Sequence, residues 1–303
     1  MISVIICTYN RSESLRGTLE SLRAMHVSTA KPWELIVVDN NSQDATRRVV
    51  EEFESKALLP VRYVLEAQPG LSYARNKGIL EAKGEIILFT DDDVIVDPNW
   101  LSQMESAFDR LDCPAAGGRI VPVWEGQKPA WFQENGQFAT PKAIVSFDLG
   151  SEVCEPESAP YGANMAFRRR LFEEHGMFRT DLGRTKDVLL GGEDIEYFQR
   201  LRKAGEKVLY VPDAFVYHPV AVERTRKSYF QSWCFNAARS QVRLEGFPRN
   251  VVFWLGIPRY LFRTFVENAM KWMVSLEPKR RFYYKLQVCI AAGTIAEAWR
   301  TRN

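Results

Sequence analysis

The first ninety residues alternate short apolar runs with segments of helical periodicity, and this alternation constrains the fold more than any other feature. Four apolar, β-branched runs predict strands: residues 3–7, 35–38, 61–65 and 85–89. Helical patterns separate them, starting behind Ser12, behind Ser42 or Asp44, and over residues 73–82. Because continuous apolar strands are buried on both faces, the pattern predicts an α/β fold with a mostly parallel sheet flanked by helices.

Polar clusters follow three of the predicted strands. They are Thr8-Tyr9-Asn10, Asp39-Asn40-Asn41 and Asp91-Asp92-Asp93. In open parallel sheets, ligands bind at the carboxyl ends of the strands. We therefore expect one crevice to gather all three clusters. Later in the chain, the pattern predicts a helix over 195–204 and two strands over 208–211 and 215–217.

The composition is that of an ordinary folded protein. Of 303 residues, 46% are hydrophobic and 26% charged, which excludes a disordered or fibrous chain. The five cysteines include no CxxC pair, which argues against a disulfide scaffold or a cysteine zinc site and favours a reducing compartment. We expect neither a signal peptide at the N-terminus nor a membrane-spanning helix, because no apolar run is long enough.

The charge is divided unevenly along the chain. Residues 221–303 hold 15 Lys and Arg against 5 Asp and Glu, whereas the whole chain has 40 against 38. The same segment holds 15 of the 37 aromatic residues. The sequence thus predicts an acidic part over 1–220 and a basic, aromatic, helical part over 221–303.

The acidic triplet is the most informative local feature. Three adjacent carboxylates repel one another, and a divalent cation relieves that repulsion. Their oxygen ligands suit Mg²⁺ or Mn²⁺. Since alternate residues of an extended segment point the same way, Asp91 and Asp93 are expected to share a site while Asp92 faces elsewhere. The alternative is a solvated acidic turn or a helix cap.

Five motifs, taken together and in this order, resemble those of the family 2 glycosyltransferases. They are Cys7–Arg11, Val37–Ser42, Gly70 with Ala74–Asn76, Asp91–Asp93, and Gly191–Asp194, and the resemblance ends at His218. It covers about residues 1–220. The resemblance implies the GT-A fold, a nucleotide-sugar-binding α/β domain, and transfer of a sugar from a nucleoside diphosphate to an acceptor, usually with inversion.

The resemblance also implies roles for individual residues. Those matching nucleotide-sugar-binding positions are Thr8, Tyr9, Asn10, Arg11, Asp39, Arg75, Asp91, Asp92 and Asn164. A carboxylate such as Asp39 accepts hydrogen bonds from a base imide or ribose hydroxyls, although it could instead cap the next helix. Arg75 either contacts the diphosphate or lies exposed on a helix, paired with a carboxylate such as Glu81.

By the same resemblance, Asp93, Asp91 and His218 hold the metal and Asp194 is the base. An imidazole can join carboxylates on Mn²⁺, although a lone histidine is often structural. The start of a helix favours an ionised carboxylate, which can take a proton from an acceptor hydroxyl. Glu193 would position the acceptor or the base. The alternative is an ordinary acidic pair at a helix start.

The last segment predicts two helices. One starts at Pro258 with an apolar stripe of Leu261, Phe265, Ala269, Met273 and Leu276, and the other runs from about Tyr284 to Arg300. Cations on the polar side favour peripheral contact with an anionic membrane surface. The alternative is a helical pair packed on the catalytic domain or on another subunit. No motif supports nucleic-acid binding.

Together these features predict an inverting, metal-dependent glycosyltransferase using Mn²⁺ or Mg²⁺. Its donor would carry UDP, GDP or dTDP, and its acceptor would be a glycan or a polyprenyl-linked glycan. The expected location is cytoplasmic, with the protein bound peripherally to the cytoplasmic face of the membrane. The alternatives are a catalytically decayed binding or scaffold protein and a sugar nucleotidyltransferase, which would need a Gly-rich basic loop where Thr8–Arg11 stands. A glycoside hydrolase needs no nucleotide pocket.

Overall fold

The computed structural model describes residues 1–26, 31–56, 58–185, 190–248 and 250–300. The chain divides into two compact units. The first, here called the sheet unit, comprises Met1–Val123, Val145–Asp181 and Glu193–Pro219. The second, the helical unit, comprises Trp124–Ile144, Leu182–Gly192 and Val220–Asn303. The two-part division at residue 220 stays a prediction about domain organisation.

In the part of the chain that the structure describes, eight strands form the main sheet, in the order β3-β2-β1-β4-β7-β6-β8-β5. Their bounds are Ile2–Thr8 (β1), Trp33–Asp39 (β2), Val61–Leu65 (β3), Ile86–Asp91 (β4), Ile95–Val96 (β5), Ala115–Trp124 (β6), Asn164–Arg168 (β7) and Val208–Val220 (β8). β1 pairs in parallel with β2 and β4, and β2 with β3. β7 is antiparallel to β4 and β6, and β5 to β8.

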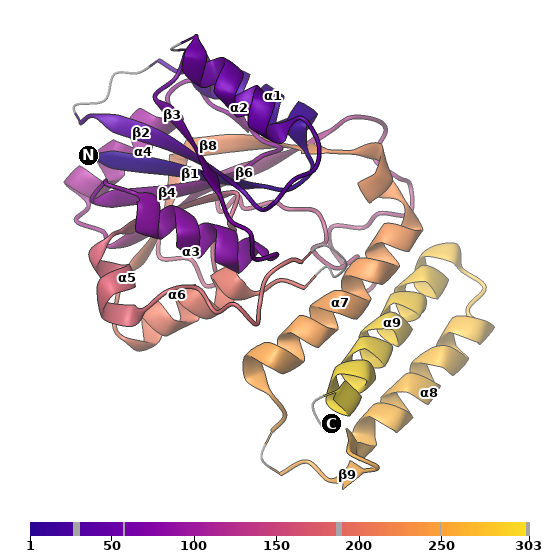
Figure 1. Cartoon of the computed structure of the whole chain (residues 1–303). Helices are drawn as coiled ribbons and strands as arrows, with labels where there is room; N and C mark the ends of the chain where they lie inside the picture. Colours follow the sequence, from indigo (N-terminus) through magenta and orange to yellow (C-terminus); the bar gives the residue numbers. More distant parts are fainter. Residues whose placement is uncertain (27–30, 57, 186–189, 249, 301–303) are drawn as a thin grey trace. The chain divides into compact units, whose positions relative to one another are not determined.

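Helices cover both faces of this sheet (Figure 1). One face carries α1 (Ser12–Arg23), α2 (Thr46–Ser55) and α4 (Trp100–Arg110), and the other carries α3 (Leu71–Glu81), α5 (Arg170–His175) and α6 (Glu193–Lys203). In β1, Val4 and Ile6 enter the core under α1 and α2, while Ile5 enters the opposite core. Continuous apolar strands are therefore buried on both sides, and the predicted α/β class is confirmed.

Several predicted boundaries were wrong. The two strands expected over 208–217 are the single strand β8, because the backbone stays extended through Pro212, whose fixed φ fits a strand. Ser12 is the first residue of α1 rather than its cap, and its N–H donates to the Asp44 carboxylate at 2.9 Å. α2 begins at Thr46, whose N–H and hydroxyl also donate to Asp44.

The helical unit is built mainly from three long helices, α7 (Lys227–Glu245), α8 (Arg259–Val274) and α9 (Pro278–Arg300), and α9 lies between the other two (Figure 1). A short 3₁₀ helix, η1 (Val222–Thr225), precedes α7, and a hairpin of β9 (Phe253–Trp254) and β10 (Ile257–Pro258) precedes α8. Pro258 therefore ends the hairpin, and α9 starts before the predicted Tyr284. None of the described helices is both long and apolar enough to cross a membrane.

An aromatic core holds the helical unit together. Phe230 of α7 and Phe282 of α9 are buried and contact the ring of Trp131 edge-on, with centroids at 5.0 and 4.8 Å. Trp124 contacts Phe132 in the same core. These two tryptophans thus serve packing within the helical unit.

A buried carboxylate also links α7 to α9. Glu297 is fully buried, and it accepts hydrogen bonds from Arg239 at 3.0 Å, Arg243 at 2.7 Å and Arg300 at 2.6 Å. Burial alone would raise the pKa of Glu297, but the hydrogen bonds from the three guanidinium groups outweigh it and hold that pKa below its ordinary value. Glu297 is therefore ionised in the folded chain.

Replacing Glu297 with Gln is expected to lower the free energy of unfolding by about 2 kcal/mol at neutral pH, less than for a fully buried pair because the arginines are partly exposed. The lowered pKa stabilises the fold above the unfolded value, so the difference should shrink as the pH falls below about 4. Urea unfolding across pH measures both. Glu267→Gln, at an exposed ion pair with Arg263, is the control and should change little; equal effects of the two variants would contradict the assignment.

Candidate active site

Three strand ends bring the predicted site residues to one edge of the sheet. In the parallel register, Thr8 of β1 lies opposite Asp39 of β2, and Cys7 lies opposite Asp91 of β4. The first two polar clusters and the acidic triplet are therefore neighbours. The predicted gathering of these clusters at the carboxyl ends of the strands is what the register produces.

Arg11 compensates the acidic triplet. Its guanidinium pairs with Asp92 Oδ1 and with Asp93 Oδ2, both at 2.6 Å, and the Thr8 hydroxyl donates to Asp92 Oδ2 at 2.7 Å. Asp92 is buried; burial raises its pKa to about 7, against the opposing effect of Arg11. Asp92 thus faces inward and ties the ends of β1 and β4 together. Contact of Thr8, Arg11 or Asp92 with a nucleotide stays a prediction.

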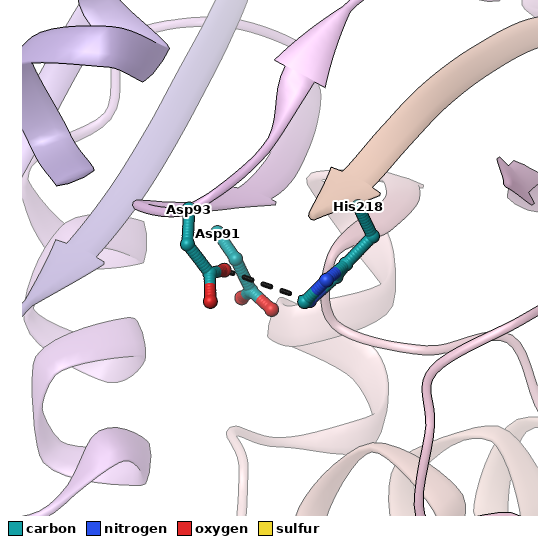
Figure 2. A group of neighbouring side chains, drawn as sticks. All are labelled: Asp91, Asp93 and His218. Carbon is teal, nitrogen blue, oxygen red and sulfur yellow. Dashed lines mark ion pairs between the residues drawn. The ribbon is translucent and has the colours of Figure 1, made fainter. Parts of the chain in front are cut away.

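Asp91 and Asp93, on either side of Asp92, form a candidate metal centre with His218. Figure 2 shows Asp91, Asp93 and His218 turned toward one another, with potential ligand atoms that all lie within 4.8 Å. His218 Nε2 is 3.5 Å from Asp93 Oδ1. Two carboxylates and an imidazole are a donor set that suits Mn²⁺, and Mg²⁺ is compatible with the carboxylates. The residues present therefore fit the predicted cation.

The ring of His218 is oriented for this role. His218 is buried at the end of β8, and its Nδ1–H donates to the carbonyl of Pro219 at 3.1 Å, since a carbonyl can only accept. The other ring nitrogen, Nε2, faces Asp93, and in a neutral ring with its proton on Nδ1 it offers a lone pair. A hydrogen bond that fixes the tautomer in this way is typical of histidines that bind metals.

Asp39 is held by a turn and by a tyrosine. Its Oδ1 accepts from the backbone N–H of Ser42 at 2.9 Å, and its Oδ2 accepts from the Tyr63 hydroxyl at 2.8 Å. Burial and the neighbouring carboxylate raise the pKa of Tyr63 to about 12, so its hydroxyl stays protonated and donates. Asp39 does not cap α2, whose first turn is bonded by Asp44; that alternative is wrong.

The remaining polar residues at this edge brace the loops. Asn10 has a φ of +51° and joins the first two strand ends, since its N–H donates to Ser42 Oγ and its Oδ1 accepts from the Gln43 N–H. Tyr9 lies half-buried beside it. Asn40 accepts from the N–H of Gly70, so the loop after β2 also positions the start of α3.

Arg75 is buried and pairs with Glu193. Its Nη1 lies 2.5 Å from Glu193 Oε1, and both side chains are about 95% buried. The alternative of an exposed arginine paired with Glu81 is wrong, because Glu81 pairs with Arg62 and Lys77. A Cβ on Gly162 would fall 1.8 Å from Arg75 Nη2, so this glycine makes room for the guanidinium. Contact of Arg75 with the diphosphate stays a prediction.

Asp194 adjoins this pair and titrates near neutrality. Its Oδ2 accepts from the N–H of Gly162 at 3.2 Å, and its Oδ1 accepts from the N–H of Ile195 at 2.8 Å. Burial and repulsion by Glu193 raise the pKa of Asp194 to about 6, and Arg75 limits the rise. Among the described residues, no group donates to Glu193 Oε2, which is buried. The geometry therefore provides a carboxylate suited to accepting a proton.

Asn164 lies on the strand next to the acidic triplet, opposite Thr90, and its side chain is directed into the sheet unit. It is fully buried at the start of β7; its Oδ1 accepts from Trp100 Nε1 at 2.9 Å, and its Nδ2 donates to the carbonyls of Arg119 and Ala214. Both amide hydrogens are used within the protein. The side chain of Asn164 therefore serves the architecture of the sheet, and its contact with the donor stays a prediction.

Sequence reasoning missed two contributions to this site. Tyr63 lies in the middle of an ordinary strand, and only the pairing of β2 with β3 brings its hydroxyl to Asp39. The need for glycine at position 162 depends on Arg75, which lies 87 residues earlier in the chain. The small residues of Gly162-Ala163 indicate a close approach, but no local pattern names its partner.

Comparisons with known proteins identify the family of the chain. Residues 3–176 match the family model for Glycosyl transferase family 2. A glucosyl-dolichyl phosphate glucuronosyltransferase of Haloferax volcanii is 30% identical over 231 residues, covering 74% of this chain and 71% of that protein. The succinoglycan biosynthesis protein ExoM of Rhizobium meliloti is 26% identical over 244 residues, covering 80% and 74%.

Solved structures show the same fold. The mannosyltransferase PcManGT from Pyrobaculum calidifontis, in complex with GDP-Man and Mn²⁺, has a TM-score of 0.55 and 20% identity, covering 98% of this chain and 73% of that one. The 1–349 fragment of S. aureus TarS has a TM-score of 0.56 and 17% identity, covering 100% and 92%. The GT-A fold implied by the resemblance is confirmed.

Replacing Asn164 with Ala is expected to lower the free energy of unfolding by about 2–4 kcal/mol, because the Trp100 N–H and two backbone carbonyls would be left buried without partners. Urea unfolding measures this loss. Asn10→Ala, which removes an exposed loop contact, is the comparison and should cost much less. An Asn164→Ala protein of unchanged stability that binds nucleotide more weakly would contradict the structural role and support donor binding by Asn164.

Proposed function

Because the chain belongs to glycosyl transferase family 2, we propose that it transfers a sugar from a nucleoside diphosphate to a hydroxyl group, with inversion at the anomeric carbon. The observation that carries the proposal is the meeting of the acidic triplet with the Arg75–Glu193–Asp194 group. Cys7, next to Asp91 across the sheet, lies within electrostatic range of both Arg75 and Glu193. A donor bound at the strand ends would therefore lie between the candidate metal ligands and the candidate base.

The nucleoside would lie against the loop after β2. Asp39 is fixed by Tyr63 and Ser42, and its remaining lone pairs can accept from a base imide or from ribose hydroxyls. Tyr9 and Asn10 would border the same nucleoside. Two solved neighbours carry GDP-Man and UDP-GlcNAc, so both a guanine and a uracil donor are reasonable starting points, with dTDP sugars as the third class.

Asp91, Asp93 and His218 would hold Mn²⁺ or Mg²⁺ against the donor diphosphate. When bound, the cation would supply positive charge that stabilises the departing nucleoside diphosphate. Arg11 fixes Asp93 through Oδ2 and leaves Oδ1 facing His218, so the ligand oxygen is oriented before any cation arrives. This prior orientation lowers the cost of assembling the site.

Asp194 would act as the base. With a pKa of about 6 it is mostly ionised at neutral pH, yet basic enough to take the proton of the attacking hydroxyl. The hydroxyl oxygen then bonds to the anomeric carbon as the bond to the diphosphate breaks on the opposite face, which inverts the configuration. Glu193, held by Arg75, keeps the base in place, and its second oxygen is available to a hydroxyl of the sugar or the acceptor.

We further propose that the acceptor is a glycan or a lipid-linked glycan and that the enzyme works on the cytoplasmic face of a membrane. The Haloferax relative is named for a dolichyl phosphate substrate and the Rhizobium relative for succinoglycan biosynthesis. All five cysteines are free thiols, which fits a reducing compartment. The complete set of charged partners around Asp93 and Asp194 gives no support to a decayed site or scaffold.

Replacing Asp93 with Asn is expected to abolish the stabilisation by Mn²⁺ plus nucleoside diphosphate in a thermal-shift assay. Wild-type protein at a ligand concentration 100 times the dissociation constant should gain about 2.7 kcal/mol. Glu206→Gln is a matched control, since Glu206 belongs to a second carboxylate–histidine group that Arg170 already occupies. An unchanged metal response in Asp93→Asn would remove Asp93 from the metal site.

Replacing Asp194 with Asn should abolish transfer while leaving nucleotide binding intact. In the wild type, release of nucleoside diphosphate should rise with pH through about 6, as Asp194 becomes ionised. Arg75→Met removes the cation that stabilises ionised Asp194. The pH at which the rate rises should therefore move up by about one pH unit. Arg75→Lys keeps the charge and should leave that pH unchanged. A wild-type rate independent of pH between 5 and about 8 would refute the base assignment.

A further inference from the structure

Exposed apolar side chains gather on one surface of the helical unit. They occupy the hairpin segment Val252–Leu255 and the outer face of α8, where Val266, Met270 and Val274 follow one another at helical spacing. Leu276, in the turn before α9, continues this row and is 95% exposed. We call this set the hairpin–α8 surface. So many large apolar groups in one patch mark an interaction site rather than ordinary surface.

This surface differs from the apolar stripe that the sequence predicts for the membrane and shares only Leu276 with it. Leu261, the first residue of that stripe, is buried, and Phe265 and Ala269 are half-buried, because this side of α8 packs against α9. α8 carries apolar residues on both sides, and the periodicity alone does not say which side the neighbouring helix covers. The structure leaves the side with Met270 and Val274 uncovered among the described residues.

Cations surround the apolar row. Arg259 and Arg263 lie at its hairpin end and Lys271 beside its middle, and the exposed Lys279–Arg281 lie at its far end, just after Leu276. Over residues 250–281 there are six Lys or Arg and two Glu, one of which pairs with Arg263. The surface therefore combines apolar contact area with a positive rim.

An open hollow lies where the hairpin meets α8. It has a volume of about 560 Å³ and is lined by Asn250, Val251, Val252, Arg259, Tyr260 and Arg263. Two guanidinium groups, a phenol and an amide offer several donors to one anion, and guanidinium groups match the oxygens of a phosphate. The adjoining Phe253 and Trp254 are exposed aromatic rings of the kind found at the boundary between lipid headgroups and acyl chains.

We propose that the hairpin–α8 surface lies in the interface of an anionic lipid bilayer. Val266, Met270, Val274 and the rings of the hairpin enter the boundary of the acyl chains, and Arg259 and Arg263 bind a lipid phosphate. With 16 residues, α8 is too short to span a bilayer but has the length and pattern of a helix lying in its plane. This goes beyond the proposed sugar transfer, because the surface needs neither donor nor metal.

Vesicle flotation of the full chain, without nucleotide or metal, tests the proposal. Wild-type protein should float with vesicles of equal parts phosphatidylcholine and phosphatidylglycerol, and much less with phosphatidylcholine alone. Met270→Ser with Val274→Ser, and separately Arg259→Gln with Arg263→Gln, should each weaken binding about tenfold or more. All four side chains are exposed, so the variants should fold; circular dichroism checks this.

Leu80→Ser is the matched control, since Leu80 is an equally exposed apolar residue on α3 of the sheet unit. It should float like the wild type. Wild-type protein that stays with the aqueous fraction, or apolar and arginine variants that float as well as the wild type, would overturn the proposal. The proposal would also be overturned if the wild-type protein is a dimer in solution and the double variant Met270→Ser, Val274→Ser is a monomer. In that case the surface binds a second copy of the chain. Because nucleoside diphosphate release is measured separately, failure here leaves the proposed transfer untouched.

Discussion

The architecture of the candidate site depends on how two arginines compensate a group of carboxylates at one edge of the sheet. Arg11 pairs with Asp92 and Asp93, and Arg75 pairs with Glu193. Without these cations, the carboxylates of Asp92 and Asp93 and that of Glu193 would be buried or half-buried with no positive charge to compensate them. Burying like charges in this way costs far more than a surface ion pair contributes. The loops and helix starts around them are arranged to bring the arginines in.

Much of this arrangement could be predicted from the sequence, because it follows from local patterns. The apolar run before Asp91 and the alternation of side chains in an extended segment are enough to predict that Asp91 and Asp93 share a site while Asp92 faces elsewhere. The structure adds the partner of each group. Arg11 pairs with Asp92 and Asp93 across 81 and 82 residues, and Arg75 with Glu193 across 118. Such pairings depend on strand order, which a single sequence specifies poorly.

In the helical unit, too, the sequence predicts the elements but not their contacts. Its basic, aromatic composition and its helices are readable from the sequence, yet the burial of each face is not. Gly293 lets α9 approach α7, since a Cβ there would lie 2.1 Å from the carbonyl of Phe235, and Glu297 then pairs with arginines of α7. α9 thus has two helical neighbours, whereas α8 packs on α9 by the side that bears Leu261. Whether an apolar stripe meets protein is decided by such contacts between helices.

The two arginines also divide the site into two electrostatic parts. The Arg11 group surrounds Asp91 and Asp93, the candidate metal ligands. The Arg75 group surrounds Asp194, whose pKa is raised by burial and by Glu193 and lowered by Arg75. These two parts are not independent, because Arg75 also interacts electrostatically with Asp91. If a charged donor binds at the strand ends, it would therefore act on the pKa of Asp194 as well as on the acidic triplet.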